Sequence, residues 1–187
     1  MGPGTCVNVY EFVPPSVRTK ALGAIGDTYV RAGAFASANF GTAPQLRAKK
    51  GISPDNTRRS YVKFAVTEVQ AGDHITLRLT GYLSNTTNPT LRTLLYAVSD
   101  TSWNEDIMTW YTRPNLDAML ASVVVSGTAR QKFDIDVTRY VQQQKTAGHD
   151  AVSFALRNPT HSSAQAIFDS REAGLGGPRL IITRAGQ

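Results

Sequence analysis

Cysteine is almost absent from this chain of 187 residues, which contains Cys6 alone. A single cysteine cannot form an intramolecular disulfide or supply a cysteine-rich zinc site. Long apolar runs are also missing: no stretch reaches the roughly 18 apolar residues that a membrane-spanning helix needs, so the sequence predicts no membrane partner. With 41% hydrophobic and 18% charged residues, the composition is that of a folded domain rather than a disordered chain or a coiled coil.

Acidic residues are in the minority. The chain has 20 Lys and Arg against 14 Asp and Glu, which gives a formal net charge of +6. Most of the basic residues are arginines, whose planar guanidinium can bind a carboxylate or a phosphate through two parallel hydrogen bonds. Such a surface suits nucleic acid, anionic lipid or an acidic polysaccharide, and net charge alone does not choose among them.

The N-terminus lacks the charged segment and apolar core of a signal peptide. Its first four residues, Met-Gly-Pro-Gly, are typical of a segment added for expression. We therefore expect residues 1–23 to be an N-terminal extension or an added segment, with a possible first strand. Residues 24–187 are expected to form one domain.

Short runs rich in Val, Ile, Phe, Tyr, Leu and Thr recur along the chain, separated by Gly, Pro, Asn and Asp. This spacing predicts an all-β sandwich. Strands are expected at residues 7–12, 27–31, 45–49, 60–66, 74–83, 92–99, 119–125, 132–136, 151–158, 166–170 and 179–183. At most one short helix is predicted, over residues 137–146, with Asp136 or Thr138 as its N-cap and Gly148 at its end.

Alternation along four of these strands assigns their side chains to two faces, because residues i and i+2 of a strand point to the same side. The residues expected to face the core are Val30, Leu46, Ala48, Val62, Phe64, Val66, Val152, Phe154 and Leu156. Those expected to face outward are Tyr29, Arg31, Arg47, Lys49, Arg59, Tyr61, Lys63 and Arg157.

Each of the four strands thus places a basic residue on a non-core face, and two add a tyrosine. If the strands share a sheet, the result is a basic surface interleaved with aromatic rings. Such a surface could pair with uronate carboxylates while tyrosines pack on sugar rings, or bind phosphates while bases stack on the rings. Asp27 is the only acid within these four strands, which favours a binding role over a merely solvated face. Trp103 and Trp110 are better explained as plugs at the end of the sandwich than as a sugar platform.

Several motifs occur in an order and spacing that resemble the DNRLRE-type domains, which include carbohydrate-binding module family 96. In the N-terminal half they are Asp27-Thr28-Tyr29-Val30-Arg31-x-Gly33, Asn39-Phe40-Gly41, Leu46-x-x-Lys49 and Arg59-Ser60-Tyr61-Val62-Lys63-Phe64. In the C-terminal half they are Trp103-x-Glu105-x-Ile107-x-Thr109-Trp110, Asp136-Val137-Thr138-x-x-Val141, Val152-Ser153-Phe154, Phe168-x-Ser170-Arg171-Glu172 and Pro178-x-Leu180. The strand at 74–83 departs from the family in lacking an Ala-x-Leu-x-Leu opening.

The resemblance implies that residues 24–187 form a β-jelly-roll carbohydrate-binding domain without catalytic residues. Such modules are attached to secreted polysaccharide-degrading enzymes, so we expect an extracellular protein with a catalytic domain on the same parent chain. Some members bind alginate, and an acidic polysaccharide (alginate or a related polyuronate) is the predicted ligand. On this analogy the binding residues are Arg31, Lys49, Arg59, Lys63, Arg157 and Arg171, supported by Tyr29 and Tyr61. Alternation selects all of them except Arg171 independently.

Two alternative functions stay open. In a polysaccharide lyase, Tyr61 could act as the base if the charges of Arg59 and Lys63 lowered its pKa. A single-stranded nucleic-acid-binding module would suit the basic surface, although no helix-turn-helix, zinc-finger or RNA-recognition motif is present, and no nucleic-acid partner is predicted.

No cofactor or metal site is predicted. His74, His149 and His161 lack metal-ligand spacing. A structural calcium ion would use loop carboxylates, for which Asp27, Asp55, Asp169 and Glu172 are the candidates. They show no EF-hand spacing, and we expect them to be surface or capping residues.

Overall fold

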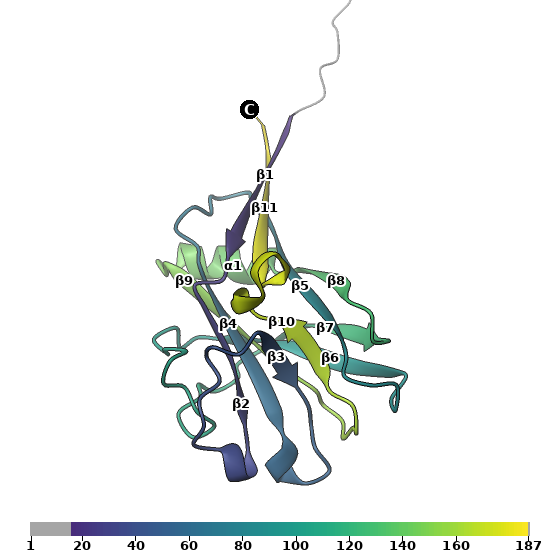
Figure 1. Ribbon diagram of the computed structural model, residues 1–187. Helices are drawn as coiled ribbons and strands as arrows, with labels where there is room; N and C mark the ends of the chain where they lie inside the picture. Colours follow the sequence, from purple (N-terminus) through teal and green to yellow (C-terminus); the bar gives the residue numbers. More distant parts are fainter. Residues whose placement is uncertain (1–15, 187) are drawn as a thin grey trace, which may run out of the picture.

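The computed structural model describes residues 16–186, which form two antiparallel β-sheets that face each other (Figure 1). The six-stranded sheet has the order β1 (Val17–Gly23), β11 (Arg179–Ala185), β5 (His74–Leu83), β10 (Ala166–Asp169) and β3 (Gln45–Ala48), and β8 (Gln131–Asp136) also pairs with β5. The five-stranded sheet has the order β2 (Gly26–Arg31), β4 (Arg58–Ala65), β9 (Ala151–Arg157), β6 (Thr90–Val98) and β7 (Met119–Ser126). The predicted all-β sandwich is confirmed.

Helical structure is confined to short segments. The single α-helix, α1 (Thr138–Thr146), begins where the Asp136 carboxylate accepts a hydrogen bond of 2.9 Å from the backbone N–H of Thr138. Three 3-10 turns connect strands: η1 (Gly33–Phe35), η2 (Pro54–Asn56) and η3 (Arg171–Gly176). None of the helices within residues 16–186 is long and apolar enough to cross a membrane.

Strand β1 lies in the N-terminal segment, residues 1–23, where a possible first strand was expected without bounds. Its sequence, VRTKALG, mixes polar and apolar residues, and its side chains are mostly exposed at the edge of the six-stranded sheet, where it pairs only with β11. A strand with little buried surface carries no alternating apolar pattern to detect. The strand expected at residues 7–12 and Cys6 lie outside the described residues.

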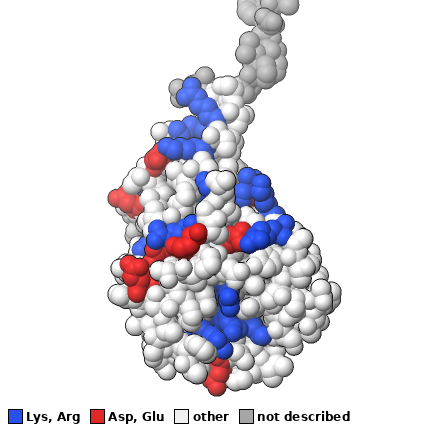
Figure 2. Space-filling view, viewed as in Figure 1, with Lys and Arg blue, Asp and Glu red and all other residues white. Residues whose placement is uncertain are grey.

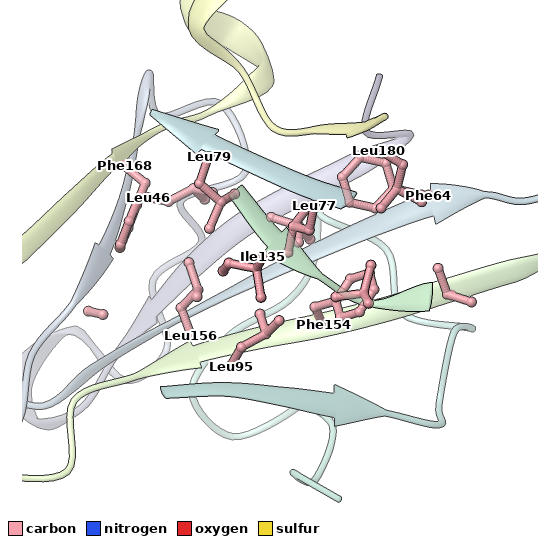
Figure 3. Close-up of a cluster of buried hydrophobic side chains, with 14 of the residues drawn as sticks. Leu46, Phe64, Leu77, Leu79, Leu95, Ile135, Phe154, Leu156, Phe168 and Leu180 are labelled. Atoms are coloured by element: carbon pink, nitrogen blue, oxygen red, sulfur yellow. The ribbon is translucent and has the colours of Figure 1, made fainter. Parts of the chain in front are cut away.

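The main core lies between the two sheets (Figure 3). Strand β5 has the expected bounds and alternates, with Ile75, Leu77 and Leu79 completely buried and the intervening side chains partly exposed. From the opposite sheet, the rings of Phe64 and Phe154 meet edge to face, with centroids 6.2 Å apart. The expected core residues of β3, β4 and β9 are all in this cluster: Leu46, Ala48, Val62, Phe64, Val152, Phe154 and Leu156, with Val66 just beyond β4.

Gly81 in β5 shows how closely two strands pack in this core. A Cβ atom there would lie 2.5 Å from the Phe168 ring and 2.7 Å from the backbone oxygen of Ile167. The absence of a side chain is therefore required for β10 to approach β5 with the aromatic ring of Phe168 inside the sandwich.

A second apolar cluster covers part of the outer face of the five-stranded sheet. Residues 99–118, the covering loop between β6 and β7, place Trp103 and Met108 on Val30, Tyr61 and Ala155 of the sheet. Trp103 is 7% exposed. The interpretation of this tryptophan as an apolar plug is confirmed, although it seals an outer face of the sandwich rather than its end.

Candidate functional site

The register between β2 and β4 separates the predicted binding residues onto two faces. Val30 lies opposite Arg59 and therefore shares the covered outer face with it. Tyr29 and Arg31 point to the other side of the sheet, toward β3. The prediction that Val30 faces the core between the sheets, and that Tyr29 and Arg31 share a face with Arg59 and Tyr61, is wrong. Alternation finds two faces, but it cannot tell which is inner when apolar groups cover both.

Tyr61 holds the covering loop in place. Its side chain is fully buried, and its hydroxyl donates a hydrogen bond of 3.1 Å to the backbone oxygen of Pro114. Burial raises the pKa of Tyr61 despite the nearby charges of Arg59 and Arg113. The lowered pKa expected of a lyase base is therefore wrong, and the ring is not available to a sugar.

Lys63 is also committed to the covering loop. Its ammonium donates to the backbone oxygens of Thr101 at 3.0 Å and Trp103 at 2.6 Å, and it lies 4.5 Å from the centroid of the Trp103 ring. Burial lowers the pKa of Lys63, while Glu105 and Asp100 act in the opposite direction. These contacts fix the loop over the sheet instead of presenting a free charge.

Arg171 is already paired with acids. Its guanidinium forms ion pairs with Glu105 and, at 3.0 Å, with Glu172, and its backbone N–H donates to Asp27 at 2.8 Å. The prediction that Arg171 offers its charge to a polymeric uronate does not fit this arrangement. Glu105 is 66 residues away in sequence, so the pairing could not be read from spacing.

A patch of arginines surrounds Trp110 beside the covering loop. The guanidinium carbons of Arg59 and Arg113 lie 5.3 Å and 3.9 Å from the centroid of that ring. Continuing the β4–β9 register places Arg157 beside Arg59 on the same face. We call Arg59, Arg113, Arg157 and Trp110 the arginine–tryptophan patch. Cationic groups stacked on an indole are attracted by its ring face, so the ring itself is partly occupied.

Four cations converge at the other side of the sheet, where β2, β3 and β4 come together near η1 and η2. They are Arg31, Arg47, Lys49 and Arg58, which we call the cation cluster. Arg58 lies directly opposite Arg31 across β2 and β4, and directly opposite Lys49 across an isolated bridge that joins the two sheets. Figure 2 shows Lys and Arg atoms gathered over the lower ends of β2, β3 and β4 as Figure 1 places them.

No acid balances this cluster within residues 16–186, where none of its four members forms an ion pair. Their partners are neutral oxygens. Arg31 donates to the Asn56 side chain at 3.2 Å and Lys49 to the backbone oxygen of Ser163 at 2.8 Å. The Nε donors of Arg31, Arg47 and Arg58 have no hydrogen-bond partner.

Mutual repulsion is visible in the pKa values. Burial, followed by the charges of Arg31 and Arg47, lowers the pKa of Arg58. Burial, followed by the charges of Arg58 and Arg31, lowers the pKa of Lys49. A folded protein holds like charges together at a cost, and an anion placed among them would remove that cost.

Family membership is decided by the match of the chain to a family model. The model of carbohydrate-binding module family 96 matches residues 18–184. The chain belongs to this family. It is therefore a carbohydrate-binding module, a non-catalytic binding domain.

Two known proteins are similar to the module. A gellan lyase from Bacillus sp. is 29% identical over 151 residues, which is 79% of this chain and 6% of that enzyme. The module thus spans only a small part of the relative's length. Among solved structures, the CBM36-1 domain of a multidomain xylanase from the hindgut metagenome of Trinervitermes trinervoides is 14% identical, with a TM-score of 0.38, covering 86% of this chain and 99% of that one.

Aromatic rings support the cation cluster of the module from within and from the side. Tyr29 is 6% exposed and stacks on Phe40 with centroids 4.3 Å apart, and Arg47 lies 5.5 Å from the Tyr29 ring. Arg31 lies 4.0 Å over the ring of Phe35, which is 44% exposed. Tyr29 is thus a buried support for the cations rather than a ring on which a sugar can pack, whereas Phe35 is the ring that solvent reaches.

Two members of the cluster were not selected from the sequence. Alternation placed Arg47 outward beside Lys49, but the family motif passed over it. Arg58 was missed because alternation sends it to the inner face, where apolar residues were expected. The signal was the doublet Arg58-Arg59: consecutive residues of a strand point to opposite faces, so the doublet supplies one cation to each side.

Proposed function

We propose that the module binds an acidic polysaccharide, alginate or a related polyuronate, at the cation cluster. The observation that supports this is the convergence of four cations without an acid partner in the described part of the chain. Guanidinium groups bind carboxylates through paired hydrogen bonds, and the lysine adds a point charge. A repeating polymer of uronic acids supplies carboxylates in series, which suits several cations at one site.

The exposed ring beside the cluster adds a contact for the sugar itself. The ring of Phe35 is held by Arg31 and open to solvent, so the apolar face of a pyranose can pack against it while its carboxylate reaches the cations. Each hydrogen bond between charged partners is worth about 1.5–3 kcal/mol before ordering costs. Loss of one guanidinium should therefore weaken binding about tenfold or more.

The arginine–tryptophan patch is the second candidate surface for the same polymer. It retains Arg59 and Arg157 from the sequence-based site and adds Arg113, whose pKa is lowered by burial and by the charge of Arg59. We place it second because three cations gather there, against four in the cation cluster.

The biological setting follows from the family and from the relative. We propose that the module is part of a larger secreted protein, and that it keeps a catalytic domain of that protein close to its polysaccharide. The module's similarity to a small part of a gellan lyase makes gellan a second polymer to test beside alginate.

The experiment is affinity electrophoresis of the module through gels that contain alginate, gellan or a neutral polysaccharide. A double variant, Arg31→Gln with Arg58→Gln, should lose retardation by alginate. Arg59→Gln with Arg113→Gln should keep most of it. Arg92→Gln, which removes an exposed charge on β6, is the matched control.

Retention of full alginate binding by the Arg31/Arg58 variant, with loss in the Arg59/Arg113 variant, would move the site to the arginine–tryptophan patch. Equal retardation by the neutral polysaccharide would refute an acidic ligand. Competition with single-stranded DNA tests the remaining alternative, since a polyuronate site should be displaced by alginate at concentrations where DNA has little effect.

A further inference from the structure

Three carboxylates from distant parts of the chain meet beside the covering loop. Asp27 comes from the start of β2, Glu105 from the covering loop and Glu172 from η3. One oxygen from each lies within 4.8 Å of the others. Asp27 and Glu105 are buried, whereas Glu172 is exposed. This carboxylate triad lies apart from both surfaces considered for the polysaccharide.

One oxygen of the triad has no partner. Asp27 is 1% exposed, and while its Oδ2 accepts the Arg171 N–H, its Oδ1 is buried without a hydrogen bond. A buried carboxylate oxygen is among the most costly groups to leave unsatisfied. A buried carboxylate with an unpaired oxygen, grouped with two further carboxylates, indicates a missing positive partner.

The charges in the structure do not supply that partner in full. Arg171 pairs with Glu105 and Glu172, and thus leaves three carboxylates against one guanidinium. The ammonium of Lys63 lies near Glu105 but is occupied by two backbone oxygens. Burial is the main reason that the pKa of Asp27 rises to about 7; the bond from Arg171 opposes this rise, and the charges of Glu172 and Glu105 add to it.

We propose that Asp27, Glu105 and Glu172 form a calcium-binding site that joins β2, the covering loop and η3. All three donors are carboxylate oxygens, which hard cations prefer, and none is the imidazole or thiolate that zinc would favour. Calcium accepts irregular geometry and completes its shell of six to eight oxygens with water, which can enter beside the exposed Glu172. Magnesium, which requires a near-octahedral arrangement, suits the site less well.

The sequence analysis weighed four acids for calcium, and the structure unites only two of them. Asp27 and Glu172 meet at the triad, whereas Asp169 pairs with Arg130 at 3.1 Å and Asp55 lies in η2. Glu105 completes the group from a position that spacing did not mark.

The site would act as a clamp on the covering loop. Glu105 accepts the backbone N–H of Asp27 at 2.7 Å, and its own backbone oxygen accepts the side-chain amide of Asn39. A cation bound to Glu105 would therefore fasten the loop to β2 independently of any sugar. This role does not depend on the proposed polysaccharide ligand.

The test begins with the module stripped by chelator and dialysed into metal-free buffer. Calcium should raise its melting temperature by roughly 5–10 °C at a hundredfold excess over the dissociation constant, and magnesium should raise it less. Isothermal titration with calcium should give one site per chain. No calorimetric binding and no thermal shift at millimolar calcium would overturn the proposal and leave a proton on Asp27 as the neutralising partner.

Variants locate the site. Asp27→Asn keeps the side-chain shape and removes a buried like charge, so it should fold without metal, melt no lower than the metal-free module and lose the calcium shift. Glu172→Gln changes an exposed residue that cannot unfold the core, and should lose most of the shift. Asp106→Asn, an exposed acid of the same loop, should keep it. Full calcium shifts in both Asp27→Asn and Glu172→Gln would overturn the assignment.

Terbium luminescence offers a spectroscopic test that reports binding at the site itself, because a general stabilising effect would not produce the signal. Gly26 is flanked by Glu105 Oε2 and by the Trp103 ring, which would lie 3.5 Å and 3.6 Å from a Cβ atom placed there. Terbium bound at the triad should therefore luminesce when tryptophan is excited, and calcium should displace it. The signal should be absent in Glu172→Gln, and its persistence there would refute the site.

Discussion

Removal of one charge from the cation cluster should make the module more stable and a weaker binder. The clearest change is Arg58→Gln, because Arg58 lies directly opposite both Arg31 and Lys49. Charged pairs in such cross-strand positions are worth roughly 0.2–1 kcal/mol each, and like charges are destabilising. Relief of two repulsive pairs should therefore raise the free energy of unfolding by about 0.4–2 kcal/mol. The substitution also removes the hydrogen bond from Arg58 to the Asn56 backbone oxygen, which is long at 3.4 Å and contributes less.

For a domain of this size, 1 kcal/mol corresponds to about 2–4 °C in melting temperature, so Arg58→Gln should melt a few degrees above the wild-type module in low salt. Its affinity for alginate should fall about tenfold or more. At 1 M salt the Debye length is only about 3 Å, and the difference in melting temperature should become smaller, although half-buried charges such as Arg58 are screened less than exposed ones.

Arg92→Gln is the matched control, because it removes the same charge from an exposed position on β6. It should leave both melting temperature and alginate binding close to the wild-type values. If Arg58→Gln melts below the wild type in low salt, the cations do not repel one another as argued. If it melts higher but binds alginate unchanged, the repulsion is real and the ligand site lies elsewhere.

Three further changes separate the roles of individual side chains. Phe35→Ala removes a ring that is 44% exposed, so alginate binding should weaken several-fold in titration calorimetry while the melting temperature stays nearly constant. Tyr61→Phe leaves a backbone oxygen of the covering loop unpaired, and urea unfolding should show a loss of about 1–3 kcal/mol with alginate binding retained. The guanidinium of Arg184, bonded to the buried Asp73 at 2.5 and 2.7 Å, holds the pKa of that carboxyl below its usual value. The stabilisation from Asp73 is therefore present at neutral pH and lost as falling pH protonates its carboxylate. Asp73→Asn should be about 1–3 kcal/mol less stable than the wild type at pH 7, and the two should approach equal stability below about pH 4. Urea unfolding at several pH values would measure this difference.

Sequence patterns predicted most of the strands because these strands bury one face. Strand β5 matches its expected bounds at both ends, since Ile75, Leu77 and Leu79 alternate with partly exposed residues against a single core. The same reasoning failed at β2. There Val30 is buried under the covering loop and Tyr29 on the other side of the sheet, so both faces are closed and alternation has no exposed side by which to orient the strand.

The candidate site was only partly predictable, because the sequence shows which side chains are charged but not which charges are balanced. Arg31 and Lys49 were expected in a basic group and do lie among cations, but Arg31 is not on the face of Arg59 as predicted, and the binding role of both stays a prediction. Arg171 looked equivalent in sequence, yet it pairs with Glu105 of the covering loop as well as with its neighbour Glu172. Such compensation depends on contacts between residues far apart in the chain, which no local pattern encodes.

Whether a cationic side chain is available to a ligand depends on the groups that the fold places in contact with it. Lys63 meets backbone oxygens of the covering loop and becomes part of the scaffold. Arg171 meets carboxylates and becomes part of a buried charge network. Arg31 and Arg58 meet each other and an asparagine, where β2 ends and β4 begins beside η1 and η2. Since holding like charges together costs stability, and the four cations of this cluster form no ion pair within residues 16–186, a bound anionic polymer would relieve their repulsion.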